Sequence, residues 1–176
     1  MTNTSIWGDY YEKGKYIEIL FGNTIDIFGD VIPASKTEDI FDHWDIKLII
    51  HDIECPLIKT NRVENFLTFD VKSLKRTERS DEHVNENQHY VELKNVKGKP
   101  GWLYGKSDYI AFEKLDSWVI VDRLKLINFI HLYTQNPKYC FKPILYGIYT
   151  RNKRQDEVML VETKKLEEIS TLILKK

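Results

Sequence analysis

Apolar and polar residues alternate along two stretches of the chain, and a period of two is typical of a β-strand that buries one face. The first predicted strand is Trp44–His51, and the second is Phe66–Leu74, in which Phe69 and Val71 share one face. A loop that contains Pro56 separates the two stretches. The pattern therefore predicts two neighbouring strands in the first half of the chain.

Apolar residues recur every three or four positions in three other stretches, and this spacing predicts amphipathic helices. In the first of them Ile17 and Phe21 follow the spacing, and Gly22 supplies a stop signal. Residues 23–42 show neither period and are predicted to be irregular, with a short turn beginning near Thr37. The predicted helices are Ser5–Gly22, Arg123–Tyr133 and Lys164–Leu174.

Shorter strands are predicted in the remainder of the chain, after a polar stretch at residues 75–88 that is either a loop or an exposed helix. The order of helices and strands lacks a regular βαβ alternation. It predicts an α/β protein of the α+β type, in which a mixed β-sheet is flanked by helices. The further predicted strands are Tyr90–Val96, Asp108–Phe112, Trp118–Val121, Leu145–Thr150 and Val158–Val161.

The composition is that of an ordinary globular protein. A length of 176 residues, with 42% hydrophobic and 30% charged residues, predicts a single domain over residues 1–176. Cys55 and Cys140 lack the spacing of a zinc site, and we expect both to be reduced. Because we find neither an apolar run of ~18 residues nor a signal peptide, we expect a cytoplasmic protein that contacts no membrane.

Charge is distributed unevenly along the chain, although the net charge is only −1. Residues 1–70 hold 13 acidic and 6 basic residues, whereas residues 71–176 hold 14 acidic and 20 basic residues. An acidic half can gather a cation, and a basic half can meet phosphate groups. Two solvated faces of a nearly neutral protein would give the same counts.

Three residues on the two predicted strands form a candidate catalytic group. Asp70 and Lys72 share one face of a strand, roughly 6–7 Å apart along it. If the two strands pair in antiparallel fashion, Asp45 falls near Lys72 and diagonally from Asp70. Two carboxylates at such a separation repel each other unless a divalent cation lies between them.

This residue set suits the hydrolysis of phosphodiesters. A cation held by carboxylate oxygens neutralises charge on the phosphoryl group and acidifies a bound water. A lysine beside the cation can position that water and offset negative charge in the transition state. We therefore assign Asp45 and Asp70 to metal binding and catalysis, and Lys72 to positioning the water.

The runs HWDIKLII and FDVKSLKR resemble the PD-(D/E)XK nuclease superfamily, which includes restriction endonucleases and Holliday junction resolvases. Its pattern is an acid on one strand and an acid-x-lysine on the next, which matches Asp45, Asp70 and Lys72. Trp44 stands where proline is usual, and Asp70 stands where glutamate is commoner. The resemblance covers about Trp44–Arg123, whose later part is similar to small phage-type members.

The resemblance implies a restriction-endonuclease-like fold and a nuclease that depends on Mg²⁺ or Mn²⁺. It favours DNA over RNA as the substrate and an endonuclease over an exonuclease, while the sequence itself leaves both choices open. Members that cut duplex DNA are often homodimers, so a homodimer is expected on the same ground. Some relatives carry a further glutamate on the first helix, and both Glu12 and Glu18 qualify. We prefer Glu18 as a third metal ligand because it lies beside the apolar face of that helix.

Two features compete with this assignment. Glu92-Leu93-Lys94 is a second acid-x-lysine and could be the true catalytic pair. His43 lies close to Asp45 and is a candidate ligand, although a histidine in such a position is more often a surface or capping residue.

Basic and aromatic residues between positions 75 and 106 are candidates for binding nucleic acid. Cations can follow the phosphate backbone, and an aromatic ring can stack on an unpaired base. The alternative is a tight surface turn whose Trp102 fills part of the core. The candidate residues are Lys75, Arg76, Lys94, Lys99, Trp102, Tyr104 and Lys106.

The preferred hypothesis is thus a metal-dependent nuclease. The alternative is a catalytically silent module of the same fold that binds nucleic acid or a protein, for example a phage factor directed against a host system. A third interpretation is an α/β protein unrelated to nucleases, in which Asp70 and Lys72 only form a solvated strand face.

Overall fold

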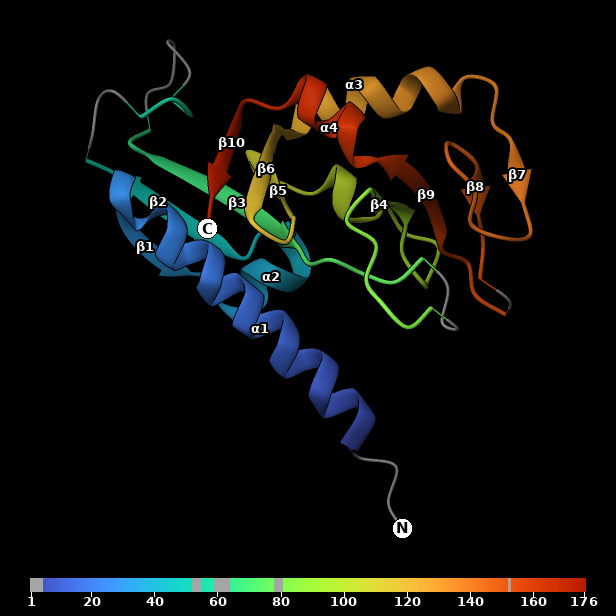
Figure 1. Ribbon diagram of the computed structural model, residues 1–176, viewed down its shortest axis with the longest axis horizontal. Coiled ribbons are helices and arrows are strands. Elements are labelled where there is room, and N and C mark those ends of the chain that lie inside the picture. Colours follow the sequence, from blue (N-terminus) through green and yellow to red (C-terminus); the bar gives the residue numbers. More distant parts are fainter. Residues whose placement is uncertain (1–4, 52–54, 59–63, 78–80, 152) are drawn as a thin grey trace.

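The computed structural model describes residues 5–51, 55–58, 64–77, 81–151 and 153–176. Within these residues the chain forms two mixed β-sheets and four α-helices, which are α1 (Ser5–Ile25), α2 (Lys36–Asp42), α3 (Arg123–Thr134) and α4 (Thr163–Ile169). Figure 1 shows α1 beside the larger sheet, and the smaller sheet on the other side of the molecule. The predicted α+β class is therefore confirmed.

The larger sheet has six strands, which are antiparallel except at the centre, where β3 and β5 run parallel. Because β2 and β3 are antiparallel neighbours, the beginning of β2 lies beside the end of β3. The strand order is β1 (Gly29–Pro33), β2 (Ile46–Ile50), β3 (Phe66–Lys72), β5 (Tyr109–Glu113), β6 (Ser117–Asp122) and β10 (Leu172–Lys175).

One face of the larger sheet packs against α1. Ile17, Phe21 and Ile25 of this helix belong to the same buried cluster as apolar residues of the strands. The ring of Phe21 meets those of Phe69 and Trp118 edge-on, with centroids 5.4 and 5.0 Å apart, a geometry that adds to the stabilisation from burial. The half of α1 nearer the N-terminus extends past the sheets (Figure 1).

The other face of the larger sheet packs against the smaller sheet and against α3 and α4. Ile110 and Phe112 of β5 belong to this second buried cluster, as does Val91 of β4. Because side chains alternate along a strand, β3 presents Asp70 and Lys72 to this second face. The order of the smaller sheet is β4 (Gln88–Lys94), β9 (Glu157–Glu162), β8 (Ile148–Tyr149) and β7 (Tyr139–Cys140).

Residues 23–42 are more regular than predicted. Gly29–Pro33 forms β1, which hydrogen-bonds to β2 and lies at the edge of the sheet, where a proline is tolerated. Lys36–Asp42 forms α2 rather than a turn. This short helix begins at a capping box, in which the side chain of Ser35 accepts a hydrogen bond from the amide of Glu38 and the Glu38 carboxylate accepts one from the amide of Ser35.

The predicted C-terminal helix, Lys164–Leu174, is wrong in its second half. Helix α4 ends at Ile169, and the chain continues as β10, which pairs with β6. The amide of Thr171 donates to the carbonyl of Ile120 at 2.8 Å. Pairing with an existing strand therefore outweighs the helical spacing of the apolar residues, because tertiary contacts override weak local preference.

The structure also bears on three smaller expectations, which concern residues 75–88, the two cysteines and the length of the helices. The described part of residues 75–88 contains bends and turns but no helix before β4 begins. Cys55 and Cys140 are both free thiols. None of the helices in the described ranges combines the length and the apolar content that a membrane crossing requires.

Candidate functional site

Asp45 and Asp70 face each other across β2 and β3. Asp45 directly precedes β2; the register pairs Ile46 with Phe69, and the amide of Asp45 donates to the carbonyl of Phe69 at 2.7 Å. The amide of Val71 donates to Oδ2 of Asp45 at 2.7 Å and fixes that carboxylate beside β3. The structure therefore brings Asp45 close to both Asp70 and Lys72, whose pKa values its charge raises.

Lys72 lies between a carboxylate and an aromatic ring. Its Nζ forms an ion pair with Asp70 and lies 4.6 Å from the centre of the Trp102 ring. Trp102 packs edge-on against Phe112, with centroids 6.2 Å apart. Burial lowers the pKa of Lys72, but the negative charges of Asp70 and Asp45 outweigh burial and raise this pKa above its usual value. Lys72 is therefore a fixed positive charge.

Asp70 is buried, with a side chain whose hydrogen-bonding capacity is only partly used. The residue is 3% exposed, and its Oδ1 meets Lys72. Its Oδ2 has no hydrogen-bond partner among the described residues. Burial raises the pKa of Asp70 well above its usual value, the charge of Lys72 lowers it, and the charge of Asp45 raises it again. Two carboxylates this close repel unless a proton or a cation lies between them.

Glu18, the third predicted ligand, is not grouped with the two aspartates. It lies on α1, which covers the opposite face of the sheet, and its carboxylate is ion-paired with Lys15 at 2.6 Å. Burial raises the pKa of Glu18, the hydrogen bond from Lys15 lowers it, and the charge of Asp45 raises it. Glu12 is exposed on the same helix. Across the described parts of the chain, no three His, Cys, Asp or Glu side chains are placed to hold one metal ion together.

The rival pair, Glu92 and Lys94, is divided between two environments. The pairing of β4 with β9 is irregular between these residues, and Lys94 Nζ is ion-paired with Glu157 at 2.8 Å. Glu92 instead contributes to the raised pKa of Lys72, after the larger effects of burial and of the two aspartates. His43 has a left-handed backbone, with φ of 54°, at the C-terminal end of α2, which is the capping position foreseen for it.

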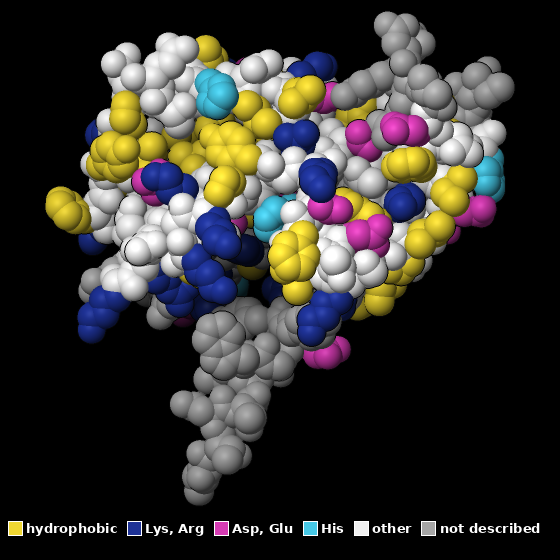
Figure 2. Space-filling model, turned by 180° about the vertical axis from the view of Figure 1, so that it is seen from behind, with side chains coloured by type: hydrophobic (Ala, Val, Ile, Leu, Met, Phe, Trp, Pro, Cys, Tyr) yellow, Lys and Arg dark blue, Asp and Glu magenta, His cyan; other side chains and the backbone are white. Residues whose placement is uncertain are grey.

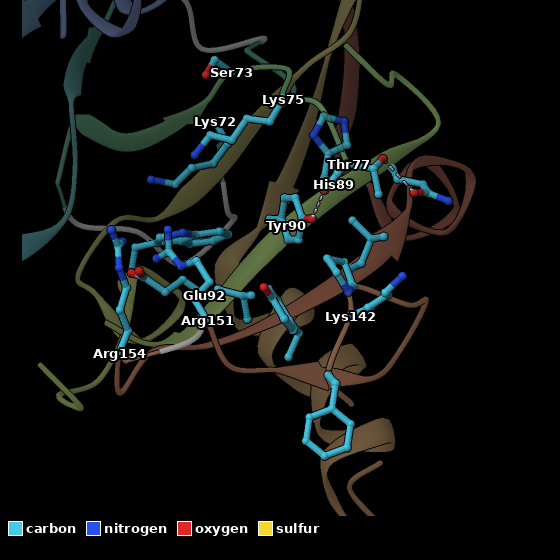
Figure 3. A pocket seen from close by; sticks show the side chains of 17 residues that line it. Lys72, Ser73, Lys75, Thr77, His89, Tyr90, Glu92, Lys142, Arg151 and Arg154 are labelled. Atoms are coloured by element: carbon cyan, nitrogen blue, oxygen red, sulfur yellow. Dashed lines mark hydrogen bonds between the residues drawn. The ribbon is translucent and has the colours of Figure 1, made fainter. Parts of the chain in front are cut away.

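A pocket of about 660 Å³ lies next to the two aspartates. Lys72 connects the two regions, because it lines the pocket and forms an ion pair with Asp70. Strands β4, β8 and β9 form one wall, and the segment that follows β3 forms another. Figure 3 shows Lys72 and Lys75 extending from one side and Arg151 and Arg154 from the other, with Glu92 near the arginines. The lining residues are Lys72, Ser73, Lys75, Thr77, Gln88, His89, Tyr90, Glu92, Trp102, Phe141, Lys142, Pro143, Tyr149, Arg151, Arg154, Val158 and Leu160.

The pocket is strongly basic. Five lysine and arginine side chains line it, against the single carboxylate of Glu92. Figure 2 shows Lys and Arg side chains gathered beside a hollow on this side of the molecule. Lys75 extends into the pocket. The surrounding protein shields its ammonium group from water, and this desolvation, together with the positive charge of Lys72, lowers the pKa of Lys75. Arg151 is ion-paired with Asp156, which is fully buried and fixes the guanidinium at the pocket wall.

The predicted nucleic-acid residues are not brought together as one surface. Lys75 and Trp102 line the pocket. Trp102 also packs on Phe112 and therefore partly fills the core, as the alternative interpretation foresaw. The guanidinium of Arg76 donates to the carbonyl of Asp81 at 3.2 Å.

The other four candidates lie outside the pocket lining. Lys94 and Lys106 are ion-paired with Glu157 and Asp42, and Tyr104 and Lys99 are exposed. Sequence reasoning omitted Lys142, Arg151 and Arg154 from the binding set. The only signal for the two arginines was a basic turn at positions 151–154, more than seventy residues from Lys72. Pairing of β9 with β4 brings that turn to the pocket.

Comparisons with known proteins give no match to a family model, to a curated protein or to a solved structure. A pair of carboxylates, one buried and one partly exposed, beside a fixed ammonium group can hold a divalent cation, and the basic pocket next to them can hold an anionic ligand. Lys72 contacts Asp70 and also lines the pocket, so a cation at the aspartates and an anion in the pocket would both lie near it.

Proposed function

We propose that the protein is a metal-dependent nuclease that hydrolyses phosphodiester bonds, with DNA as the favoured substrate. The observation that carries the proposal is the convergence of Asp45, Asp70 and Lys72 from two neighbouring strands at the edge of a basic pocket. An acid on one strand and an acid-x-lysine on the next is also the pattern behind the resemblance to the PD-(D/E)XK superfamily.

The residues present fit a Mg²⁺ or Mn²⁺ ion. Oδ2 of Asp70, which has no partner among the described residues, and the carboxylate of Asp45 would supply two oxygen ligands. Mg²⁺ is commonly bound through one or two carboxylates while it keeps several waters, so a third protein carboxylate is not required. When bound, such an ion supplies Lewis acidity and lowers the pKa of a coordinated water.

The protein's own residues divide the remaining work. Lys72, fixed by Asp70 and Trp102, offsets negative charge on the phosphoryl oxygens and orients the attacking water. Lys75 contacts the phosphate backbone on the pocket side, and Arg151, which is ion-paired with Asp156, keeps the pocket wall positively charged. The free thiols fit a cytoplasmic location, and a homodimer remains part of the proposal.

Cleavage assays on the full chain test the proposal. Supercoiled plasmid, linear duplex, single-stranded DNA and RNA are incubated with the protein in Mg²⁺ or Mn²⁺, and in EDTA. We expect metal-dependent cleavage by the wild type and at least a hundredfold loss in Asp70→Asn and Lys72→Ala, which remove a ligand and the charge beside it. Lys165→Ala is the matched control, because Lys165 pairs with Glu168 on α4, outside the pocket.

The outcome separates the rival assignments. Loss of cleavage in Lys94→Ala with activity retained in Lys72→Ala would transfer the catalytic role to Glu92 and Lys94. Absence of metal-dependent cleavage on all four substrates, by a protein whose thermal unfolding shows it to be folded, would falsify the nuclease proposal. Thermal unfolding of each variant shows whether a loss of activity is only a loss of fold.

A catalytically silent binding module is the second candidate. The basic pocket favours it, because neither aspartate is among the residues that line the pocket. It is also favoured by the metal site, where the described residues bring together two carboxylates and no third ligand. On this account Asp70→Asn would bind nucleic acid as the wild type does, and neither protein would cleave it.

A further inference from the structure

The size of the basic pocket limits what can enter it. Taken as a sphere, a volume of 660 Å³ is about 11 Å across. Because the major groove alone of B-form DNA is roughly 12 Å wide, a whole duplex is wider than this pocket and cannot be enclosed by it. A volume in the range of about 300–1,000 Å³ suits a small ligand, and one unpaired nucleotide with its phosphates has such dimensions.

The charges of the pocket divide into fixed and available cations. Lys72 and Arg151 are occupied by Asp70 and Asp156. Within the described part of the chain, Lys75, Lys142 and Arg154 form no ion pair and remain available to an anion. These three cations come from the segment after β3, the segment after β7 and the turn before β9. In Figure 3 Lys142 lies at the opposite end of the pocket from Arg154, so the cations suit a chain of phosphates better than one ion.

Aromatic side chains accompany these cations. Tyr90 and Tyr149 line the wall formed by the smaller sheet, and the hydroxyl of Tyr90 donates to the carbonyl of Thr77 at 2.6 Å. That bond fixes the ring in the pocket wall. Phe141 is 101% exposed at a lining position, so its ring is available for an external partner. Rings interleaved with cations are the usual arrangement for binding single strands, because every base has a face that can stack.

We propose that this pocket binds an unpaired segment of a nucleic-acid strand, with phosphates against Lys75, Lys142 and Arg154 and a base against an aromatic ring. The inference rests on the proposed function, because the bound segment is taken to continue into the strand that Asp45, Asp70 and Lys72 cleave. It specifies the substrate as single-stranded nucleic acid, or a duplex with an unpaired end or flap. A blunt duplex lacks such a segment.

Binding in EDTA tests the pocket without cleavage. Fluorescence anisotropy is measured with a labelled oligothymidylate and with a blunt hairpin duplex of equal phosphate count. We expect the full chain to bind the single strand at least tenfold more tightly. The double variant Lys142→Ala/Arg154→Ala removes two available cations and should weaken single-strand binding roughly twentyfold at 0.1 M salt. A plot of the logarithm of the association constant against the logarithm of the salt concentration should become less steep by about 1.4.

Two further variants complete the design. Lys164→Ala/Lys165→Ala removes the same charge from α4, outside the pocket, and should leave binding within twofold of the wild type. Phe141→Ala removes an exposed ring that supports no core packing, and we expect binding to weaken about fivefold. Equal weakening in the two double variants would show a general charge effect and overturn the proposal.

The remaining outcomes are equally decisive. Equal or tighter binding of the blunt duplex would overturn the proposal, as would displacement of the oligonucleotide by an equimolar amount of inorganic phosphate. Metal-dependent cleavage without single-strand binding would leave the nuclease proposal standing and remove the pocket assignment. Single-strand binding that needs Lys142 and Arg154, without cleavage, would do the reverse.

Discussion

His89 gives a prediction whose size follows directly from its environment. The residue is 4% exposed on β4, its ring lies 5.0 Å from that of Phe112, and its Nε2 has no hydrogen-bond partner among the described residues. Burial, assisted by the positive charge of Lys114, lowers the pKa of His89 from 6.5 to about 4. The folded state therefore favours the neutral imidazole over the charged one.

The sign and magnitude follow by linkage. Above pH 6.5 His89 is neutral in both the folded and the unfolded chain, so it adds no pH dependence. Between pH 6.5 and about pH 4 the unfolded chain binds a proton that the folded chain excludes, so stability falls as pH falls. The two pKa values differ by about 2.5, and each unit corresponds to about 1.4 kcal/mol, which gives a loss of about 3 kcal/mol.

Urea unfolding followed by circular dichroism at pH 7.5 and pH 4 measures this loss. Other groups also titrate in this range, so the quantity of interest is the difference between wild type and His89→Leu. The wild type should lose about 3 kcal/mol more than the variant between the two pH values, and His89→Gln should behave like His89→Leu. A difference that does not change with pH, or an NMR titration of folded His89 near pH 6.5, would refute the reasoning.

Three substitutions test the framework that positions the site, each by urea unfolding at pH 7.5. Gly29→Ala should cost about 3 kcal/mol or more, because a Cβ would lie 1.9 Å from the carbonyl oxygen of Ile49. Leu48→Ala should cost about 2–5 kcal/mol, since the side chain is fully buried under α1. Ser35→Ala should cost about 1 kcal/mol through loss of the capping hydrogen bond to the Glu38 amide.

One control variant serves all three predictions. Lys164→Ala, at an exposed position of α4, should change stability by less than about 0.5 kcal/mol. A tolerated Gly29→Ala would mean that β1 is not held against β2 at this register. A Leu48→Ala cost near that of the control would contradict the packing of α1 on the sheet.

The fold was predictable where local pattern and tertiary environment agree. Strands β2, β3 and β6 carry alternating or continuous apolar residues, and both their existence and their approximate bounds followed from the sequence. β1 and β10 lie at the two edges of the larger sheet and have weak patterns of their own. Their structure depends on hydrogen bonds to β2 and β6, which are distant contacts that a local period does not encode.

In the candidate site, too, the residues that a local pattern brings together were predictable, and those that distant contacts bring together were not. Asp70 and Lys72 are two residues apart on one strand, so the period of two placed them on one face. The proximity of Asp45 to Asp70 required only that β2 and β3 pair as antiparallel neighbours. The basic pocket could not be foreseen, because Lys142 and Arg154 reach it only through the pairing of β9 with β4 and β8.

The central claim is that Asp45 and Asp70 share a divalent cation. Crystals of the full chain soaked in Mn²⁺ and measured at the manganese absorption edge test it directly. The account predicts one strong anomalous peak, with an oxygen of each carboxylate roughly 2.1 Å from the ion, and loss of the peak in Asp70→Asn. A peak at Glu92 or Glu18 alone, or none at the aspartate pair, would contradict it.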